Sequence, residues 1–182
     1  MHLGGQGCRA KANDVMSRFR SNRGLTPLEK KYLSPWFGKQ INLNRVTVFW
    51  GANLNSEMKV AGETFWVASG AQTFGYRVFF RERHDSGDTK QLISLAHELV
   101  HTVQHEQLGG LTRFCQKYMD GYVNAGSYED NPMERQAYDT EYRFALWLGS
   151  VPSTTGRVVR IENAVPNNYR SRQSTLVPER LR

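Results

Sequence analysis

The sequence predicts an α+β fold, in which a small sheet packs on one long helix and further helices follow. Three observations support this class. Runs of β-branched and aromatic residues fill the first half of the chain. A long segment with helical spacing of apolar residues follows between Asp88 and Gly109, and two more such segments follow at 111–122 and 131–148. With 182 residues, 39% of them hydrophobic, the chain can bury one good core, so we expect a single domain over 25–150.

The first expected element is a short helix that begins at Thr26-Pro27-Leu28-Glu29. Threonine suits the N-cap, proline the first helical position, and glutamate the third, where its side chain can complete a capping box. Pro35 and Gly38 indicate that the helix ends early. Its buried side would consist of Leu28, Tyr32, Leu33 and Phe37.

Three strands are expected next, at 46–50, 64–68 and 76–80. Each run is rich in residues that favour extended backbone, and connectors with Gly and Asn separate them. We expect the three to form one small sheet.

The helical half begins at Asp88, which can cap a long helix with Gln91 at its third position, and Gly109-Gly110 ends that helix. A second helix would bury one face, and we interpret this face as core. Asn131-Pro132 begins a third helix that extends to Leu148. The buried face of the second helix would consist of Leu111, Phe114, Cys115, Tyr118, Met119 and Tyr122.

The long helix contains His97-Glu98-Leu99-Val100-His101, a pattern typical of zinc sites. Residues four apart on a helix differ by about 40° in direction and about 6 Å in rise, so both imidazoles can bind one ion. Glu98 directly follows His97 on the helix, where its carboxylate can reach a water bound to the metal and accept a proton from that water. The alternative is a surface helix with two solvated histidines.

A catalytic zinc needs a third protein ligand and an open position for water. His105 lies about 12 Å along the axis from His97, too far to share the ion. We therefore expect a carboxylate from the third helix, and choose Glu134, with Glu141, two turns later, as the main rival. Glu134 could instead be a capping residue after Asn131. Three further acids remain open as ligands, namely Glu129, Asp130 and Asp139.

Composition defines the chain's ends and excludes several classes of protein. The net charge of +7 is concentrated in 151–182, which contains six arginines and only two acids, Glu162 and Glu179. We expect this basic tail, rich in Pro, Ser and Arg, to be loosely structured, although 158–161 could form a short strand. No run of 18 apolar residues is present, which excludes a membrane span. Two cysteines are too few for a disulfide scaffold. Residues 1–24 are expected to be a flexible segment, in which Cys8 is a free thiol or an inhibitory metal ligand.

No signal peptide is expected at 1–10, because this stretch lacks an apolar core. A cytoplasmic location, or export by a non-classical secretion or injection route, would follow.

Segments 95–104, 40–48 and 71–76 together resemble a zincin-like domain found in extracellular contractile injection systems and polymorphic toxins. The resemblance covers roughly 25–148. It implies a zincin-like architecture with a mostly antiparallel sheet. Residues 131–138 are also similar to the Glu-x-x-Ala-Asp helix of gluzincin metallopeptidases, in which the Glu completes the zinc site and the Asp orients a ligand histidine. Tyr138 stands in place of that Asp, and neighbouring Asp139 could take its role.

Together these patterns predict a zinc metallopeptidase that acts on a peptide or protein, with His97, His101 and Glu134 as ligands and Glu98 as general base. By analogy, strand 76–80 would align the substrate. Two alternatives stay open. One is a zinc-binding assembly module that no longer cleaves, and the other is a nucleic-acid or surface-binding protein that acts through its basic tail. Nothing indicates the oligomeric state. Candidate transition-state donors are Tyr138, Tyr142 and His105.

Overall fold

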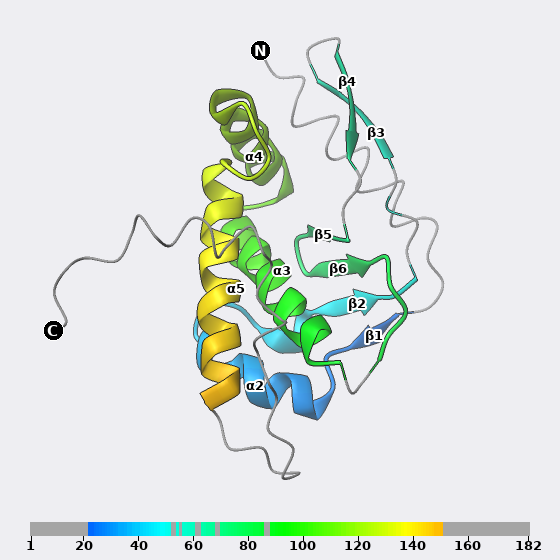
Figure 1. Cartoon of the computed structure of the whole chain (residues 1–182), viewed down its shortest axis with the longest axis vertical. Coiled ribbons are helices and arrows are strands. Elements are labelled where there is room, and N and C mark those ends of the chain that lie inside the picture. Colours follow the sequence, from blue (N-terminus) through cyan, green and yellow to red (C-terminus); the bar gives the residue numbers. More distant parts are fainter. Residues whose placement is uncertain are drawn as a thin grey trace, which may run out of the picture.

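The computed structural model describes residues 22–51, 54, 56–60, 63–67, 70–85 and 88–150. Within them the fold is α+β, as predicted (Figure 1). The expectations for Cys8 and for the tail 151–182 lie outside the described residues. Residues 23 and 24, expected in the flexible segment, form strand β1 (Arg23–Gly24), which corrects the expectation for these two residues.

Helix α2 (Pro27–Phe37) has the predicted capping box. The Glu29 N–H donates to Thr26 Oγ1 at 3.2 Å, and the Thr26 N–H donates to the Glu29 carboxylate at 2.7 Å. Leu33 and Phe37 are buried, whereas Leu28 is 52% exposed, so its expected burial is wrong. The reason is geometric: Leu28 precedes Phe37 by nine residues, which turns it by about 180° to the opposite side of the helix.

The main sheet has four strands in the order β1-β2-β6-β5. Strands β2 (Thr47–Phe49) and β6 (Arg77–Phe80) pair in parallel, and β1 and β5 (Ala71–Phe74) add to them antiparallel. A short 3-10 helix, Leu43–Arg45, precedes β2. Strand β5 therefore forms one edge of this sheet.

The run at 64–68 does not join that sheet, which corrects the expectation of one sheet. Strand β4 (Glu63–Val67) pairs with β3 (Ser56–Val60) in a separate two-stranded sheet. Residue composition indicates a strand but not its partner, and a partner that is close in the sequence costs the least loop-closure entropy.

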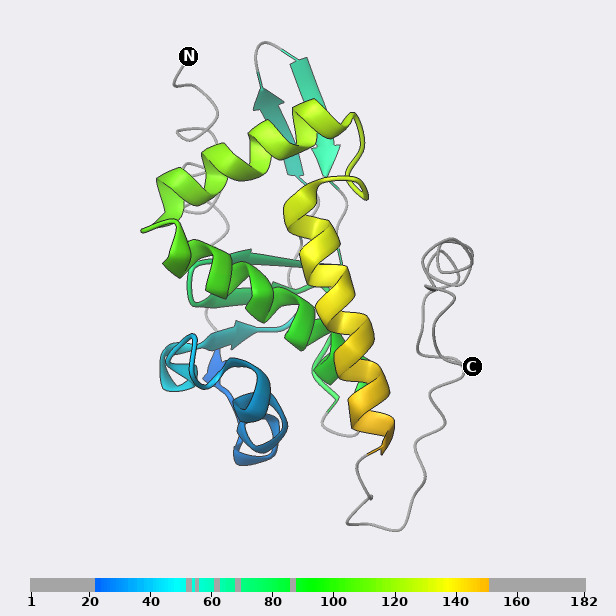
Figure 2. The same ribbon diagram turned by 90° about the vertical axis from the view of Figure 1, so that its left-hand side faces the viewer.

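Helix α3 (Thr89–Gln107) lies across one face of the main sheet, and α5 (Pro132–Ser150) runs along the side of α3 that faces away from the sheet (Figure 1). Helix α4 (Leu111–Ala125) crosses at the end where α3 stops, as Figure 2 shows. The core lies between these layers, and its fully buried members include Leu33, Val48, Val78, Ala96, Leu99, Ala137 and Phe144. Packing on both sides therefore fixes the rotation of α3 about its axis.

Asp88 caps α3 as predicted, accepting a hydrogen bond from the Lys90 N–H. Gln91 does not complete a capping box. Its side chain instead donates to the Arg83 carbonyl and accepts from the Asp85 N–H, which ties down the loop before the helix.

On α4, Phe114, Cys115 and Met119 are buried, which confirms the interpretation of that face as core. Within the described residues, no helix is both long and apolar enough to cross a membrane.

Candidate metal centre

Helix α3 presents His97, Glu98 and His101 in the interior of the protein, each less than 10% exposed. The apolar residues Ala96 and Leu99 pack into the core on the sheet side, and this packing turns the histidines toward α5. The two imidazole centroids are 5.2 Å apart. The predicted pairing of the two histidines across one helical turn is therefore present.

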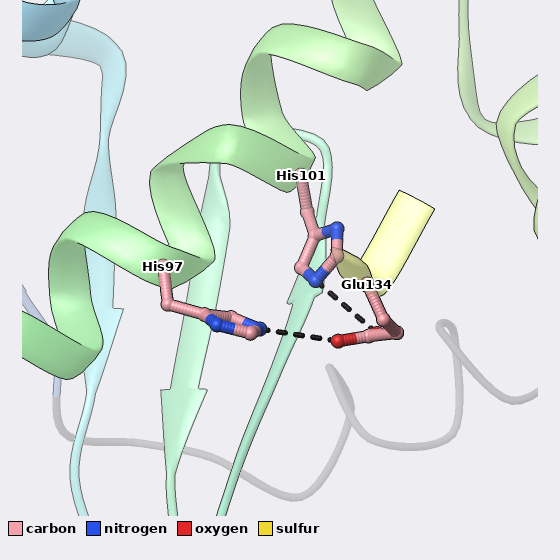
Figure 3. Close-up of side chains that lie close together, drawn as sticks. All are labelled: His97, His101 and Glu134. Atoms are coloured by element: carbon pink, nitrogen blue, oxygen red, sulfur yellow. Dashed lines mark hydrogen bonds and ion pairs between the residues drawn. The ribbon is translucent and has the colours of Figure 1, made fainter. Parts of the chain in front are cut away.

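Glu134, in the first turn of α5, faces both rings (Figure 3). Its Oε2 lies 3.2 Å from His97 Nε2, and its Oε1 lies 3.3 Å from His101 Nε2. The three side chains offer one ligand atom each within 4.8 Å of one another, and all three are buried. This group could hold a metal ion.

The spacing fits a tetrahedral ion. Ligand atoms about 2.0–2.2 Å from such an ion lie about 3.4 Å from each other, close to the two observed separations. The donor set, two imidazole nitrogens and one carboxylate, is one that zinc takes in catalytic sites. Two further carboxylates, Glu98 and Glu141, surround the same histidines. When the two histidines are neutral, as metal ligands are, these carboxylates leave an excess of negative charge that favours a cation there.

Glu141 is not in this group, although it was the main rival for the third ligand. Its Oε2 lies 3.0 Å from Nδ1 of His97, on the opposite edge of the ring from Glu134. A carboxylate can only accept here, so Nδ1 carries a proton and donates it to Glu141. This contact fixes the ring orientation and leaves Nε2 directed at Glu134.

Asp139, expected as a possible orienting acid, does not reach the site. Its side chain is 62% exposed and pairs with Arg143 at 2.8 Å. It lies five residues after Glu134, about 140° round the helix, whereas Glu141 lies seven residues on and returns to within about 20° of Glu134.

The capping interpretation of Glu134 is not what the structure shows. The N–H of Asn131, which a capping box would bond to Glu134, donates instead to the Tyr128 carbonyl at 3.2 Å. The Asn131 side chain accepts from the Met133 N–H. Glu134 is thus available to the histidines.

Glu98 has a partner that the sequence did not indicate. Thr73 of β5 donates from its Oγ1 to Glu98 Oε2 at 2.6 Å, and both residues are buried. Burial raises the pKa of Glu98, while the neighbouring His97 and His101 oppose that shift. The carboxylate is held beside the His-His-Glu group, one residue from His97.

In the metal-free site, the two histidines bind their protons tightly. Burial alone would lower the pKa of His97, but hydrogen bonds to Glu134 and Glu141 outweigh it and raise the pKa to about 10. For His101 burial acts in the same direction, and the bond to Glu134 again raises the pKa. Burial would raise the pKa of Glu134, but His101 and His97 hold it well below its usual range. The group is therefore a set of mutually paired charges when no metal is bound.

Tyrosines border the site. The Tyr118 hydroxyl donates to Glu134 Oε1 at 2.6 Å, and the Tyr128 side chain in turn bonds to Tyr118. The ring of Tyr138 packs edge-on against His97, with centroids 4.7 Å apart. The sequence predicts only a core position for Tyr118, because its regular spacing on α4 gives no sign that its hydroxyl binds Glu134.

The remaining candidates lie elsewhere. His105 packs beside Phe114 and the turn at Gly75, and is not in the metal-ligating group, as its distance along the helix predicted. Tyr142 is half-buried on α5, next to Glu141. Glu129 and Asp130 are exposed in the loop before α5, where Asp130 accepts a hydrogen bond from Ser127.

Part of the candidate metal site lies in a segment that matches a known protein family. Residues 32–109 match the family model of the eCIS core domain. The eCIS core match runs from α2 to the end of α3, so it contains Thr73, His97, Glu98 and His101, while Glu134 and Glu141 follow it. It supports the expected relation to extracellular contractile injection system proteins. No curated protein and no solved structure matches the chain.

Proposed function

We propose that the protein is a zinc-dependent metallopeptidase of the gluzincin type. One observation carries the proposal: a buried carboxylate, Glu98, lies beside a buried His-His-Glu group without being part of it. A purely structural metal site has no use for such a group, whereas hydrolysis requires a base next to the metal.

His97, His101 and Glu134 would hold the ion, and zinc bound there would supply an acidified water and polarise the scissile carbonyl. Glu98 accepts a proton from the attacking water as the new C–O bond forms. It then returns that proton to the amide nitrogen as the C–N bond breaks, so the carboxylate ends the cycle unchanged. Its raised pKa suits both steps.

A hydroxyl beside the metal site would donate to the developing oxyanion. Tyr138 is the candidate that supports this role best, because its ring already contacts His97. Burial raises the pKa of its phenol, so the hydroxyl keeps its proton for donation.

The substrate strand must be reassigned. The expected strand, 76–80, corresponds to β6, which pairs with β2 on one side and β5 on the other and so has no free backbone edge. Strand β5 is the edge, and Thr73 on it touches Glu98. A peptide that adds to β5 would therefore bring its backbone next to the base.

The test compares zinc content and hydrolysis of a broad peptide library across variants. Wild type should bind one zinc and cleave. Glu98→Gln should keep its zinc and lose activity by about 10²–10⁴-fold. Glu134→Ala should lose both, and Glu141→Ala should keep zinc with about 10–100-fold weaker affinity. Glu106→Gln, an exposed change on the same helix, is the control.

The competing function, a zinc-binding assembly module, predicts zinc without cleavage in the wild type. That outcome would overturn the peptidase. Full zinc and activity in Glu134→Ala, with both lost in Glu141→Ala, would overturn the ligand assignment.

A further inference from the structure

Gln104 lies on α3, one turn beyond His101, and is 5% exposed. Every polar atom of its side chain is engaged. Its Oε1 lies 2.9 Å from Nδ1 of His101, and its Nε2 donates to the Met133 carbonyl at 3.0 Å and to Gln136 Oε1 at 2.9 Å. A buried amide with three such contacts is held in one orientation.

These contacts determine which end of the amide faces the histidine. The Met133 carbonyl can only accept, so it must face the amide NH₂. The reverse orientation would place the amide oxygen against that carbonyl and leave both without a donor. The oxygen of Gln104 therefore faces His101.

The orientation of the amide then fixes the proton on His101. An amide oxygen can only accept, so Nδ1 of His101 carries the hydrogen. Nε2 is then the nitrogen that faces Glu134, 3.3 Å away, and it offers its lone pair once a metal displaces its proton. The Met133 carbonyl of α5 thus orients the Gln104 amide, and this amide determines which nitrogen of His101 is available to a metal.

The same carbonyl belongs to the residue before Glu134. Gln104 therefore joins the second histidine to the helical turn that supplies the proposed carboxylate ligand. His97 receives comparable support from a charged group, Glu141, whereas His101 receives it from a neutral one.

We propose that Gln104 is a positioning residue of the metal centre, which holds His101 in its metal-binding tautomer and couples it to the first turn of α5. The proposal rests on the proposed metal site but not on hydrolysis. Loss of such an orienting partner typically weakens metal affinity by about 10–100-fold.

The experiment measures zinc affinity, by competition with a chelator, for wild type, Gln104→Met and Gln104→Glu. Methionine has nearly the same shape and removes all three hydrogen bonds. Glutamate keeps an acceptor for His101 and loses the donor to Met133 and to Gln136. Gln107→Met makes the same change three residues later at an exposed position of α3 and serves as the control. Circular dichroism of each metal-free variant selects a temperature at which all are folded, so that lost stability is not read as lost affinity.

We expect Gln104→Met to bind zinc about 10–100-fold more weakly, with Gln104→Glu closer to wild type and Gln107→Met unchanged. Proton NMR of the zinc-loaded protein adds a structural readout. Wild type should show protected imidazole N–H signals from both His97 and His101, and Gln104→Met should lose that of His101 alone.

Wild-type zinc affinity together with a retained His101 signal in Gln104→Met would overturn the proposal. A wild type that binds zinc and cleaves nothing would remove the peptidase and leave this inference intact. A wild type that takes up no zinc would overturn both.

Discussion

Thr73 on the edge strand and Glu98 on the long helix share a 2.6 Å hydrogen bond, although 25 residues separate them in the sequence. The bond fixes one oxygen of the proposed base and ties it to the strand along which a peptide would pair. In the proposed reaction, Thr73 would therefore set the positions of both the substrate and the base.

Thr73→Val, which keeps the shape and removes the hydroxyl, should lower kcat about 10–100-fold, because a hydrogen bond to a charged group contributes about 1.5–3 kcal/mol. KM and zinc content should change little. Steady-state kinetics and metal analysis measure this, and Thr73→Ser should restore most of the rate. Equal kcat in Val and wild type would show that Glu98 needs no such support.

The sequence predicted the parts of the site that depend on local spacing. His97, Glu98 and His101 lie within five residues, and their arrangement follows from helix geometry alone. The first turn of α5 was also recognisable, since Asn131-Pro132 is a typical helix start. These features need no knowledge of how the elements pack.

Partners that come from packing could not be predicted. Whether Glu134 or Glu141 lies between the two histidines depends on how far α5 is shifted along α3, because both acids lie on the same side of their helix. Nothing in the sequence around Thr73, Gln104 and Tyr118 indicates a role in the site. Only tertiary packing brings their polar atoms to their partners, which are Glu98, His101 and Glu134 in that order. The same limit explains β4, whose composition indicated a strand without its partner.

Stability of the metal-free protein should fall as the pH rises from about 6.5 to about 10. The pKa of His97 is raised to about 10 in the fold, from a usual value of 6.5, by Glu134 and Glu141, which outweigh the opposing effect of burial. A raised pKa means that the folded state binds the proton more tightly than the unfolded chain does. The resulting stabilisation is complete below pH 6.5 and is lost as the pH passes the folded value. His101 acts in the same direction.

Urea denaturation at several pH values measures this effect. The zinc-loaded protein is the control, because histidines that bind a metal are already neutral and should show no comparable fall over the same range. A metal-free protein with constant stability from pH 6.5 to pH 10 would contradict the proposed charge pairing.

Tyr118→Phe removes the hydroxyl that donates to Glu134 at 2.6 Å. One buried carboxylate oxygen then keeps His101 as its partner but loses the Tyr118 donor, so the metal-free protein should lose about 1.5–3 kcal/mol of unfolding free energy. Zinc affinity should fall about tenfold, because the carboxylate is less firmly oriented. Chemical denaturation and chelator competition measure the two effects. Tyr76→Phe, outside the site, is the control, and equal losses in both variants would show that Tyr118 has no special relation to Glu134.

Thr26→Ala tests the fold separately from the site. Thr26 and Glu29 exchange two hydrogen bonds at the start of α2, and Arg23 of β1 binds both oxygens of the same glutamate at 2.7 and 2.8 Å. Removing the threonine hydroxyl leaves the Glu29 N–H without its acceptor, which should cost about 1 kcal/mol of unfolding free energy. Thr26→Ser should preserve the cap and the stability. Zinc affinity should be unchanged in both variants, because α2 contributes no ligand. If zinc binding weakened along with stability in Thr26→Ala, the metal centre would depend on the N-terminal half of the core more than these contacts indicate.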